Sequence, residues 1–241
     1  MLLRYLYSVY CICTFAALFL LLLPVFIFFG FFGEKGRKIS WRLLRLWGFV
    51  WLFLIGMSVR VHYRSSKPAS GKNYIVIANH VSYLDTVMIF RAIPFYAKPL
   101  AKAELAKIPL FGLLYKQIAV LVQRDNKESK NKSIQALKKH LEHSGSIFIF
   151  PEGTFNETEA PLAHFYDGAF RIAKETHTPI LPVLFPDTKK RLHYSSVFSF
   201  KPGVSRAVFL SEISVEEIAA LDVAQLKERV RNNMLAVLEQ L

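Results

Sequence analysis

The sequence predicts an α/β fold, with a mostly parallel central sheet flanked by helices and preceded by an N-terminal pair of membrane-embedded helices. Three observations predict it. A long apolar segment opens the chain of 241 residues. Short β-branched runs then alternate with segments of helical periodicity, which is the pattern of a parallel sheet covered by helices. Finally, two of the runs end in polar side chains that are capable of chemistry, as is common at the carboxyl edge of such a sheet.

The N-terminal segment is apolar enough to enter a bilayer. No charged residue occurs in the 29 positions from Tyr5 to Gly33, and about 20 apolar residues suffice to cross the hydrocarbon core. Its length and the lack of a small-residue cleavage pattern argue against a removable signal peptide. A buried helix of a soluble protein is the alternative. Because Pro24 can kink the helix, a hairpin that dips into one leaflet is as compatible with the sequence as a full span.

A second apolar stretch, from Leu46 to Val59, is short for a full span and suits an interfacial or re-entrant helix. Trp41, Trp47 and Trp51 fall in this region, and we expect their rings at the depth of the lipid headgroups. Lysines and arginines concentrate between the two stretches, which favours the cytoplasmic face of the inner (plasma) membrane. We therefore expect residues 1–64 to form a membrane anchor.

The α/β domain is expected at residues 65–241, after a polar linker that is rich in serine, proline and glycine. Strands and helices should alternate along it. The expected strands are Tyr74–Ala78, Ile118–Gln123, Ile147–Phe150, Ile180–Phe185 and Arg206–Leu210. The expected helices are Tyr83–Arg91, Ser129–His143, Phe165–Lys174 and a C-terminal helix within Asp222–Leu241.

Charge and cysteine content narrow the class of partner. The formal net charge of +13 is compatible with nucleic-acid binding, but the cations are dispersed or lie beside the apolar segments, and no nucleic-acid motif is visible. We therefore expect membrane lipid and acidic partners, and no nucleic acid. The two cysteines, Cys11 and Cys13, both lie in the apolar segment. They supply neither a disulfide framework nor a set of metal ligands.

The first motif that can carry chemistry is Asn79-His80, followed by Asp85. An apolar run ends at Asn79 and a helix is expected to begin near Ser82, so His80 should lie in the turn between strand and helix. A histidine that is oriented by a carboxylate can take a proton from a hydroxyl near neutral pH. The alternative is structural. Ser82 and Asp85 also have the spacing of a capping box, which alone could explain both residues.

The second motif, Pro151-Glu152-Gly153-Thr154, follows another buried run. Proline cannot continue a central strand, and Gly153 permits a close approach of the backbone to a ligand. Glu152 should therefore lie at the carboxyl end of a strand, beside His80, where ligands collect in open α/β sheets. An ordinary strand-to-loop turn with an exposed glutamate is the competing interpretation.

Two cations between these motifs are candidates for phosphate binding. Arg124 follows an expected strand, and an arginine can hold a phosphate through two parallel hydrogen bonds. Lys102 would add a point charge nearby. Taken singly, each of them has the alternative interpretation of a solvated surface cation.

Taken together, the motifs resemble those of the glycerolipid acyltransferases, most closely the bacterial 1-acylglycerol-3-phosphate acyltransferases. The resemblance covers roughly residues 70–190, with a similar pair of membrane-associated helices ahead of it. Four motifs stand in the family's order and approximate spacing: Asn79-His80-x-x-x-x-Asp85, Ile108-Pro109-x-Phe111-Gly112 with Arg124, Phe150-Pro151-Glu152-Gly153-Thr154, and Pro179-Ile-Leu-Pro182-Val183.

This resemblance implies a membrane-bound O-acyltransferase that converts lysophosphatidate to phosphatidate. It implies that His80 is the general base for the acceptor hydroxyl, that Asp85 orients it, and that the hydroxyl attacks a thioester without an acyl-enzyme. No metal or bound cofactor is implied, and the co-substrate is an acyl-CoA or acyl carrier protein thioester. The implied substrate-binding residues are Asn79, Lys102, Arg124, Pro151, Glu152, Gly153 and Thr154.

Two positions depart from the family's pattern. The family commonly has Arg-Ser where this chain has Phe155-Asn156, and frequently a lysine where it has Tyr166. Loss of an arginine removes a charge and five N–H donors, which should weaken phosphate binding. The acceptor could therefore be a lyso amino-acid lipid or another lysolipid, or the chain could be an inactive membrane-surface binding protein. The groups that could compensate are Arg124, Lys98, Lys102, Thr154 and Asn156.

Overall fold

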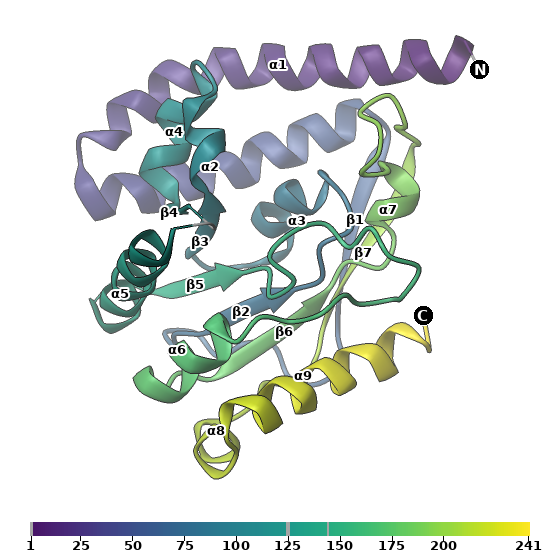
Figure 1. The fold of residues 1–241 in the computed structure, drawn as a ribbon. Helices are drawn as coiled ribbons and strands as arrows, with labels where there is room; N and C mark the ends of the chain where they lie inside the picture. The colour runs from purple at the N-terminus through teal and green to yellow at the C-terminus, as the bar shows by residue number, and fades with distance from the viewer. Residues whose placement is uncertain (1, 124–125, 144) are drawn as a thin grey trace.

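A seven-stranded sheet lies between two layers of helices (Figure 1). The computed structural model describes residues 2–123, 126–143 and 145–241. The strand order is β1-β7-β6-β2-β5-β3-β4, and every neighbouring pair is parallel except β6 and β7. The predicted α/β class with a mostly parallel sheet is therefore confirmed. The strands are β1 (Met57–Tyr63), β2 (Ile75–Ala78), β3 (Ala97–Lys102), β4 (Val120–Val122), β5 (Ser146–Ile149), β6 (Ile180–Leu184) and β7 (Gly203–Phe209).

The helices divide between the two faces of the sheet. One layer contains α1 (Leu2–Gly30), α2 (Gly33–Leu54), α3 (Asp85–Ala92) and α4 (Phe111–Ile118). The other contains α5 (Lys127–His143), α6 (Gly168–Thr176), α8 (Val215–Ala220) and α9 (Val223–Leu238). A 3₁₀ turn (Ala103–Lys107) follows β3, and the short helix α7 (Thr188–Arg191) follows β6.

Strand β2 shows why the central strands read as unbroken apolar runs. Val76 and Ala78 belong to the core under α2 and α3, whereas Ile75 and Ile77 belong to the core under α6 and α9. All four residues are buried, because a parallel sheet that is covered on both faces offers its strands no polar side. The strand carries the chain to the carboxyl edge of the sheet, where Asn79 and His80 follow.

The predicted N-terminal helical pair is present, although its second member differs from the prediction. By length and composition, α1 could cross a membrane, with a mean hydropathy of 2.8 over an 18-residue window of which only 17% is buried. Helix α2 begins at Gly33 and ends at Leu54. The end of the predicted apolar stretch, from Met57, forms β1 instead.

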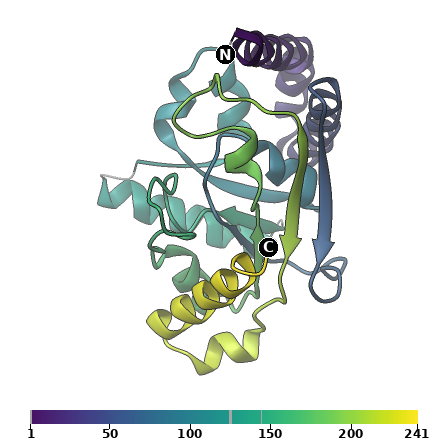
Figure 2. The same ribbon diagram turned by 90° about the vertical axis from the view of Figure 1, so that its right-hand side faces the viewer.

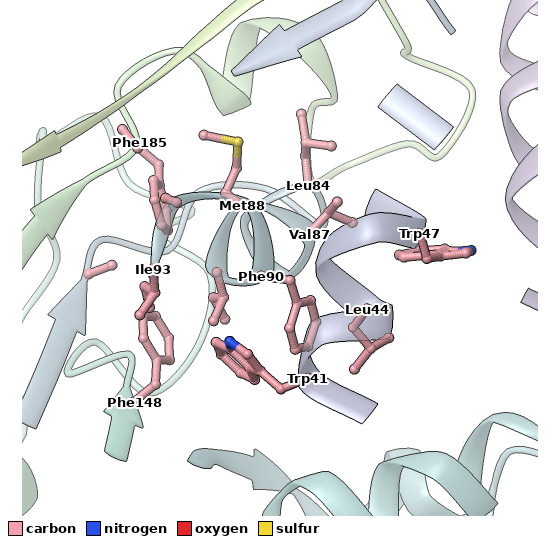
Figure 3. Packing of buried hydrophobic residues seen from close by; sticks show 14 of the residues in the cluster. Trp41, Leu44, Trp47, Leu84, Val87, Met88, Phe90, Ile93, Phe148 and Phe185 are labelled. Carbon is pink, nitrogen blue, oxygen red and sulfur yellow. The ribbon is translucent and has the colours of Figure 1, made fainter. Parts of the chain in front are cut away.

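The tryptophans of α2 lie in the protein core, so their rings do not face lipid headgroups as expected; their depth in a bilayer stays a prediction. Trp41, Trp47 and Trp51 are each at most 5% exposed. Trp41 packs against Phe90 of α3 with ring centroids 4.9 Å apart (Figure 3), and Phe15 of α1 packs edge-on against the other two. The rings are buried because α2 lies between α1 and the sheet, where it needs an apolar side chain toward each neighbour.

Strand β1 precedes the predicted boundary between residues 64 and 65, yet it belongs to the sheet. All seven of its residues pair in parallel with β7, from Met57 opposite Gly203 to Tyr63 opposite Phe209. The N-terminal segment therefore contributes an edge strand to the α/β unit. The division into domains at residues 1–64 and 65–241 stays a prediction.

Candidate active site

The two predicted motifs meet at the carboxyl edge of neighbouring strands. Strands β2 and β5 pair in parallel with Ile77 opposite Ile149, so the segments that follow them emerge side by side. The backbone N–H of His80 donates to Glu152 Oε1 at 2.7 Å. The carbonyl of His80 accepts from the backbone N–H of Asn156, also at 2.7 Å. The turn after β2 is thus bound to the turn after β5 on both sides of the histidine.

His80 and Asp85 form the pair that their spacing predicts. The distance from His80 Nδ1 to Asp85 Oδ2 is 3.0 Å. The Asp85 side chain is fully buried and that of His80 is 15% exposed. The same Oδ2 accepts the backbone N–H groups of Val81 and Ser82, at 2.7 and 2.8 Å. Because Asp85 occupies Nδ1, the imidazole has Nε2 left to accept a proton from a hydroxyl.

The position of the Asp85 side chain is not explained by a full capping box. The N-cap of α3 is Leu84, without a side-chain cap. The hydroxyl of Ser82 accepts from the N–H of Leu84 and donates to the carbonyl of Leu192. The bond from the N–H of Ser82 to Asp85 is half of such a box, but the same carboxylate oxygen also binds the histidine ring.

Two phenylalanines fix the plane of the His80 ring. The ring of Phe150 stacks on the imidazole with centroids 3.8 Å apart and an interplanar angle of 7°. Phe155 lies on it at 4.3 Å and also contacts Tyr83. These rings keep water from parts of the imidazole and restrict its rotation. Neither phenylalanine is among the substrate-binding residues that the resemblance implies. The position of Phe150, between a buried strand and Pro151, is the signal that could have indicated it.

Glu152 is buried, which contradicts the competing interpretation of an exposed glutamate. Its side chain is 2% exposed, and its two oxygens accept the backbone N–H groups of His80 and Ala163, at 2.7 and 2.8 Å. Burial is the largest influence on its pKa and raises it to about 7; the two N–H groups act in the opposite direction, and the charge of Asp85 raises it further. The carboxyl group of Glu152 thus connects the turn that contains His80 to the loop that contains Ala163.

Tyr166 covers the turn that Glu152 begins. The backbone N–H of Tyr166 donates to the carbonyl of Pro151 at 2.8 Å. Gly153 has a φ of +72°, and a Cβ atom there would lie 3.0 Å from Tyr166 Cε2. A positive φ and the close ring together favour glycine at this position. Pro151 is buried and Thr154 is exposed.

The other predicted substrate-binding residues are distributed along the same edge, and their roles stay predictions. The Asn79 amide is 2% exposed, accepts the N–H of Phe185 at 2.7 Å and donates to its carbonyl at 3.3 Å, so it joins β2 to β6. Lys102 is exposed at the carboxyl end of β3, two strands from β2. Arg124 lies outside the described residues.

Two of the groups that could have compensated for the missing cations are occupied elsewhere. Lys98, at the start of β3, lies near Arg37 and Glu34, and burial lowers its pKa. The amide of Asn156 binds within its own loop, to Ala160 and Thr158. Neither side chain faces the His80 ring through any contact among the described residues.

Comparison with known proteins places this geometry in a family. The sequence model of the family described as "Acyltransferase" matches residues 58–186. The chain is 30% identical over 179 residues to a 1-acyl-sn-glycerol-3-phosphate acyltransferase of Salmonella typhimurium, covering 72% of this chain and 70% of that protein. The protein with the same description in Saccharomyces cerevisiae is 28% identical over 212 residues, covering 86% and 68%.

A solved structure shows the same fold. The crystal structure of the 1-acyl-sn-glycerophosphate (LPA) acyltransferase PlsC of Thermotoga maritima superimposes with a TM-score of 0.76 at 22% identity, covering 98% of this chain and 97% of that one. The sheet edge at which His80, Asp85 and Glu152 lie together is therefore the candidate active site of an acyltransferase. The chain belongs to the acyltransferase family.

Proposed function

We propose that the protein is a membrane-anchored O-acyltransferase that moves a fatty acyl group from a thioester donor to the free hydroxyl of lysophosphatidate and so forms phosphatidate. The observation that carries this proposal is the contact of 3.0 Å between His80 and Asp85 at the carboxyl edge of the sheet, in a chain of the acyltransferase family. The choice of acceptor is supported by relatives that are named for 1-acyl-sn-glycerol-3-phosphate.

In the proposed mechanism, His80 Nε2 takes the proton of the acceptor hydroxyl as its oxygen attacks the thioester carbonyl carbon. A carbon–oxygen bond forms and the carbon–sulfur bond breaks. The proton on the imidazole then passes to the departing thiolate, which leaves as a thiol. Asp85 stabilises the imidazolium that exists in between, as the buried carboxylate does in a serine triad. No acyl-enzyme is formed, because the substrate itself supplies the nucleophile.

Helix α1 supports the membrane part of the proposal. It carries no charged residue after Arg4, and large side chains such as Leu21 and Phe28 are 73% and 57% exposed. An exposed apolar surface of this length is stable in a bilayer and would be a liability in water. The lysines at the start of α2, Lys35 and Lys38, favour the cytoplasmic face of the inner membrane.

A second candidate function changes only the acceptor. Phe155 contacts the His80 ring at the position where the family commonly has an arginine, and Tyr166 covers Gly153 where a lysine is frequent. These two rings offer no charge to a phosphate. They favour an acceptor without a phosphomonoester, such as a lyso amino-acid lipid or another lysolipid.

A panel of acceptors tests the choice. The protein, purified in neutral detergent, is given acyl-CoA or acyl carrier protein thioesters with lysophosphatidate, zwitterionic lysolipids or a lyso amino-acid lipid, and the products are identified by lipid mass spectrometry. We expect phosphatidate to form fastest. A preference for an acceptor without a phosphomonoester would establish the second candidate, and no acylation of any acceptor with either donor would contradict both.

A further inference from the structure

A cavity lined by cations lies beside the candidate active site. Its volume is about 850 Å³, and it opens between the first turns of α1 and the segment that follows β6. This segment reaches the N-terminal end of α1 in both ribbon views (Figures 1 and 2). No aspartate or glutamate is found among its lining residues in the described part of the chain. The cations that line it are Arg4, Lys189, Lys190 and Lys201.

Specific contacts hold the two walls of this cationic cavity together. Arg4 Nη2 donates to the carbonyl of Ser199 at 3.1 Å. The ring of Tyr5 stacks on Phe198 with centroids 4.9 Å apart. The hydroxyl of Ser199 in turn accepts the backbone N–H of His193 at 2.7 Å. The cavity is therefore formed by packed segments of the fold.

The protein offsets the charges of the cavity only in part, through the action of the nearby Asp187 carboxylate on Lys190. Lys190 and Lys201 are exposed, and neither forms a salt bridge with any described residue. The carboxylate of Asp187, close by in the sequence, is bound by Arg206 at 2.8 Å. A cluster of like charges is destabilising by itself, whereas a phosphate group can bind several such cations at once. The cavity has the chemistry of a phosphate site.

The cavity is joined to the His80 turn but does not include its catalytic groups. Pro186, which lines the cavity, follows Phe185, whose backbone is bound by the Asn79 side chain. The next contact along the segment runs from the Ser82 hydroxyl to the carbonyl of Leu192. Strands β6 and β2 are parallel neighbours, about 4.8 Å apart. His80, Asp85 and Glu152 are absent from the lining.

We infer that this cavity binds the phosphate-bearing nucleotide end of a coenzyme A thioester, the acyl donor; the inference rests on the proposed function. In lysophosphatidate, two carbons join the phosphate to the reacting hydroxyl, so its partners must lie close to the imidazole. In a coenzyme A thioester, a long flexible arm separates the phosphates from the thioester, so they bind at a distance from it. The cationic cavity meets that second requirement.

The volume of the cavity suits the nucleotide better than an acyl carrier protein. Cavities of roughly 300–1,000 Å³ are typical for ligands of cofactor size. A carrier protein needs a complementary surface of about 800 Å² on each partner. The rings of Tyr5 and Phe198 stack on each other and are still about half exposed, so they leave aromatic surface against which a nucleobase can pack.

Direct binding tests the assignment without reference to turnover. Full-length protein in neutral detergent is titrated with coenzyme A, and with pantetheine as a ligand without phosphate, by isothermal titration calorimetry. We expect wild type to bind coenzyme A and not pantetheine. In the double variant Lys190→Glu/Lys201→Glu, the Kd for coenzyme A should rise roughly tenfold or more, because two charge-assisted contacts are lost.

A matched control carries the same change in net charge elsewhere. Lys130→Glu/Lys139→Glu places it on exposed positions of α5, and its Kd should change by no more than about twofold, because solvent screens distant charges. In steady-state assays, the cavity variant should raise the KM for acyl-CoA and leave that for the acceptor unchanged.

Several results would overturn the assignment. In the binding experiment, these are no binding of coenzyme A by wild type, or equal Kd values in the cavity variant and the control. In the other assays, the assignment is overturned if the cavity variant changes only the KM for the acceptor, only the KM for acyl carrier protein donors, or only the association with anionic vesicles. Failure of the proposed function is distinguishable. Coenzyme A binding that depends on Lys190 and Lys201, without acylation of any acceptor, would contradict the function and leave the site. Phosphatidate synthesis with unchanged coenzyme A affinity in the cavity variant would contradict the site alone.

Discussion

The Glu152 carboxyl group connects three segments of the chain through two backbone N–H groups, and it does so out of contact with solvent. Its pKa is raised to about 7, chiefly by burial. The folded state therefore binds a proton at this group at pH values where the unfolded chain has already released it. The stability that this difference contributes is fully present below the ordinary pKa of a glutamate, near 4.5, and is lost as the pH rises through 7.

A comparison with Glu152→Gln tests this linkage. Between pH 4.5 and pH 8, the free energy of unfolding of wild type should fall by roughly 3 kcal/mol relative to that of the variant, at 1.36 kcal/mol for each pKa unit. Because both proteins share every other titrating group, the difference between them isolates Glu152. The measurement is denaturant unfolding in neutral detergent at a series of pH values. A difference that is independent of pH, or that grows in favour of wild type as the pH rises, would contradict the raised pKa.

At this scale the sequence predicted the pair that is close along the chain and the position of Glu152 beside His80, and it missed the other distant contacts. His80 and Asp85 are five residues apart, and a turn between strand and helix is enough to bring them together. The contact of Ser82 with Leu192 and that of Glu152 with Ala163 depend on loops whose paths are set by tertiary packing. Nothing in the local sequence encodes them.

Helices α1 and α2 pack through tryptophans whose indole N–H groups are satisfied differently. Trp51 Nε1 donates to the carbonyl of Cys11 at 3.1 Å in a buried setting. Trp47 Nε1 is buried with no hydrogen-bond partner among the described residues. The two rings stack on each other with centroids 5.9 Å apart, so they share much of the same surroundings.

This contrast predicts unequal costs for the same substitution. Trp51→Phe loses a buried hydrogen bond to the Cys11 carbonyl, which the Thr14 hydroxyl still binds. It should destabilise the fold by roughly 1 kcal/mol more than Trp47→Phe, which removes a donor without a partner among the described residues. Thermal or denaturant unfolding in detergent provides the comparison. Equal losses, or a larger loss for Trp47→Phe, would show that the Trp51 bond does not hold the two helices together.

The elements that the sequence predicted are those with a single strong pattern. Strands β2, β5 and β6 are buried on both faces and read as unbroken apolar runs, and α9 has a regular helical stripe. Strand β1 was missed because Met57 continues the apolar stretch of α2. Its exposed Arg60 and His62 alternate with residues that are only half-buried, so the strand pattern is weak. Strand β3 contains Lys98 and Pro99, which are poor strand formers, and its pairing with β5 and β4 determines its conformation.

The whole molecule presents an exposed apolar helix, a basic segment and a reactive sheet edge. If α1 is embedded in the bilayer as proposed, the hydrophobic effect holds the protein there, and salt cannot release it. The protein should therefore remain with sedimented membranes in high salt and in alkaline carbonate, and enter the supernatant only with detergent. Release by salt alone would indicate electrostatic attachment and would contradict the anchor.

At the same scale, the proposed reaction requires one imidazole, that of His80. The most direct test measures the initial rate of thioester-dependent phosphatidate formation by His80→Ala, with His143→Ala as a control, since His143 is an exposed histidine on α5. Removal of a general base should lower the rate by on the order of 10³-fold, whereas His143→Ala should match wild type, and both variants should unfold at the wild-type temperature. Near-normal turnover by a folded His80→Ala variant would contradict the account.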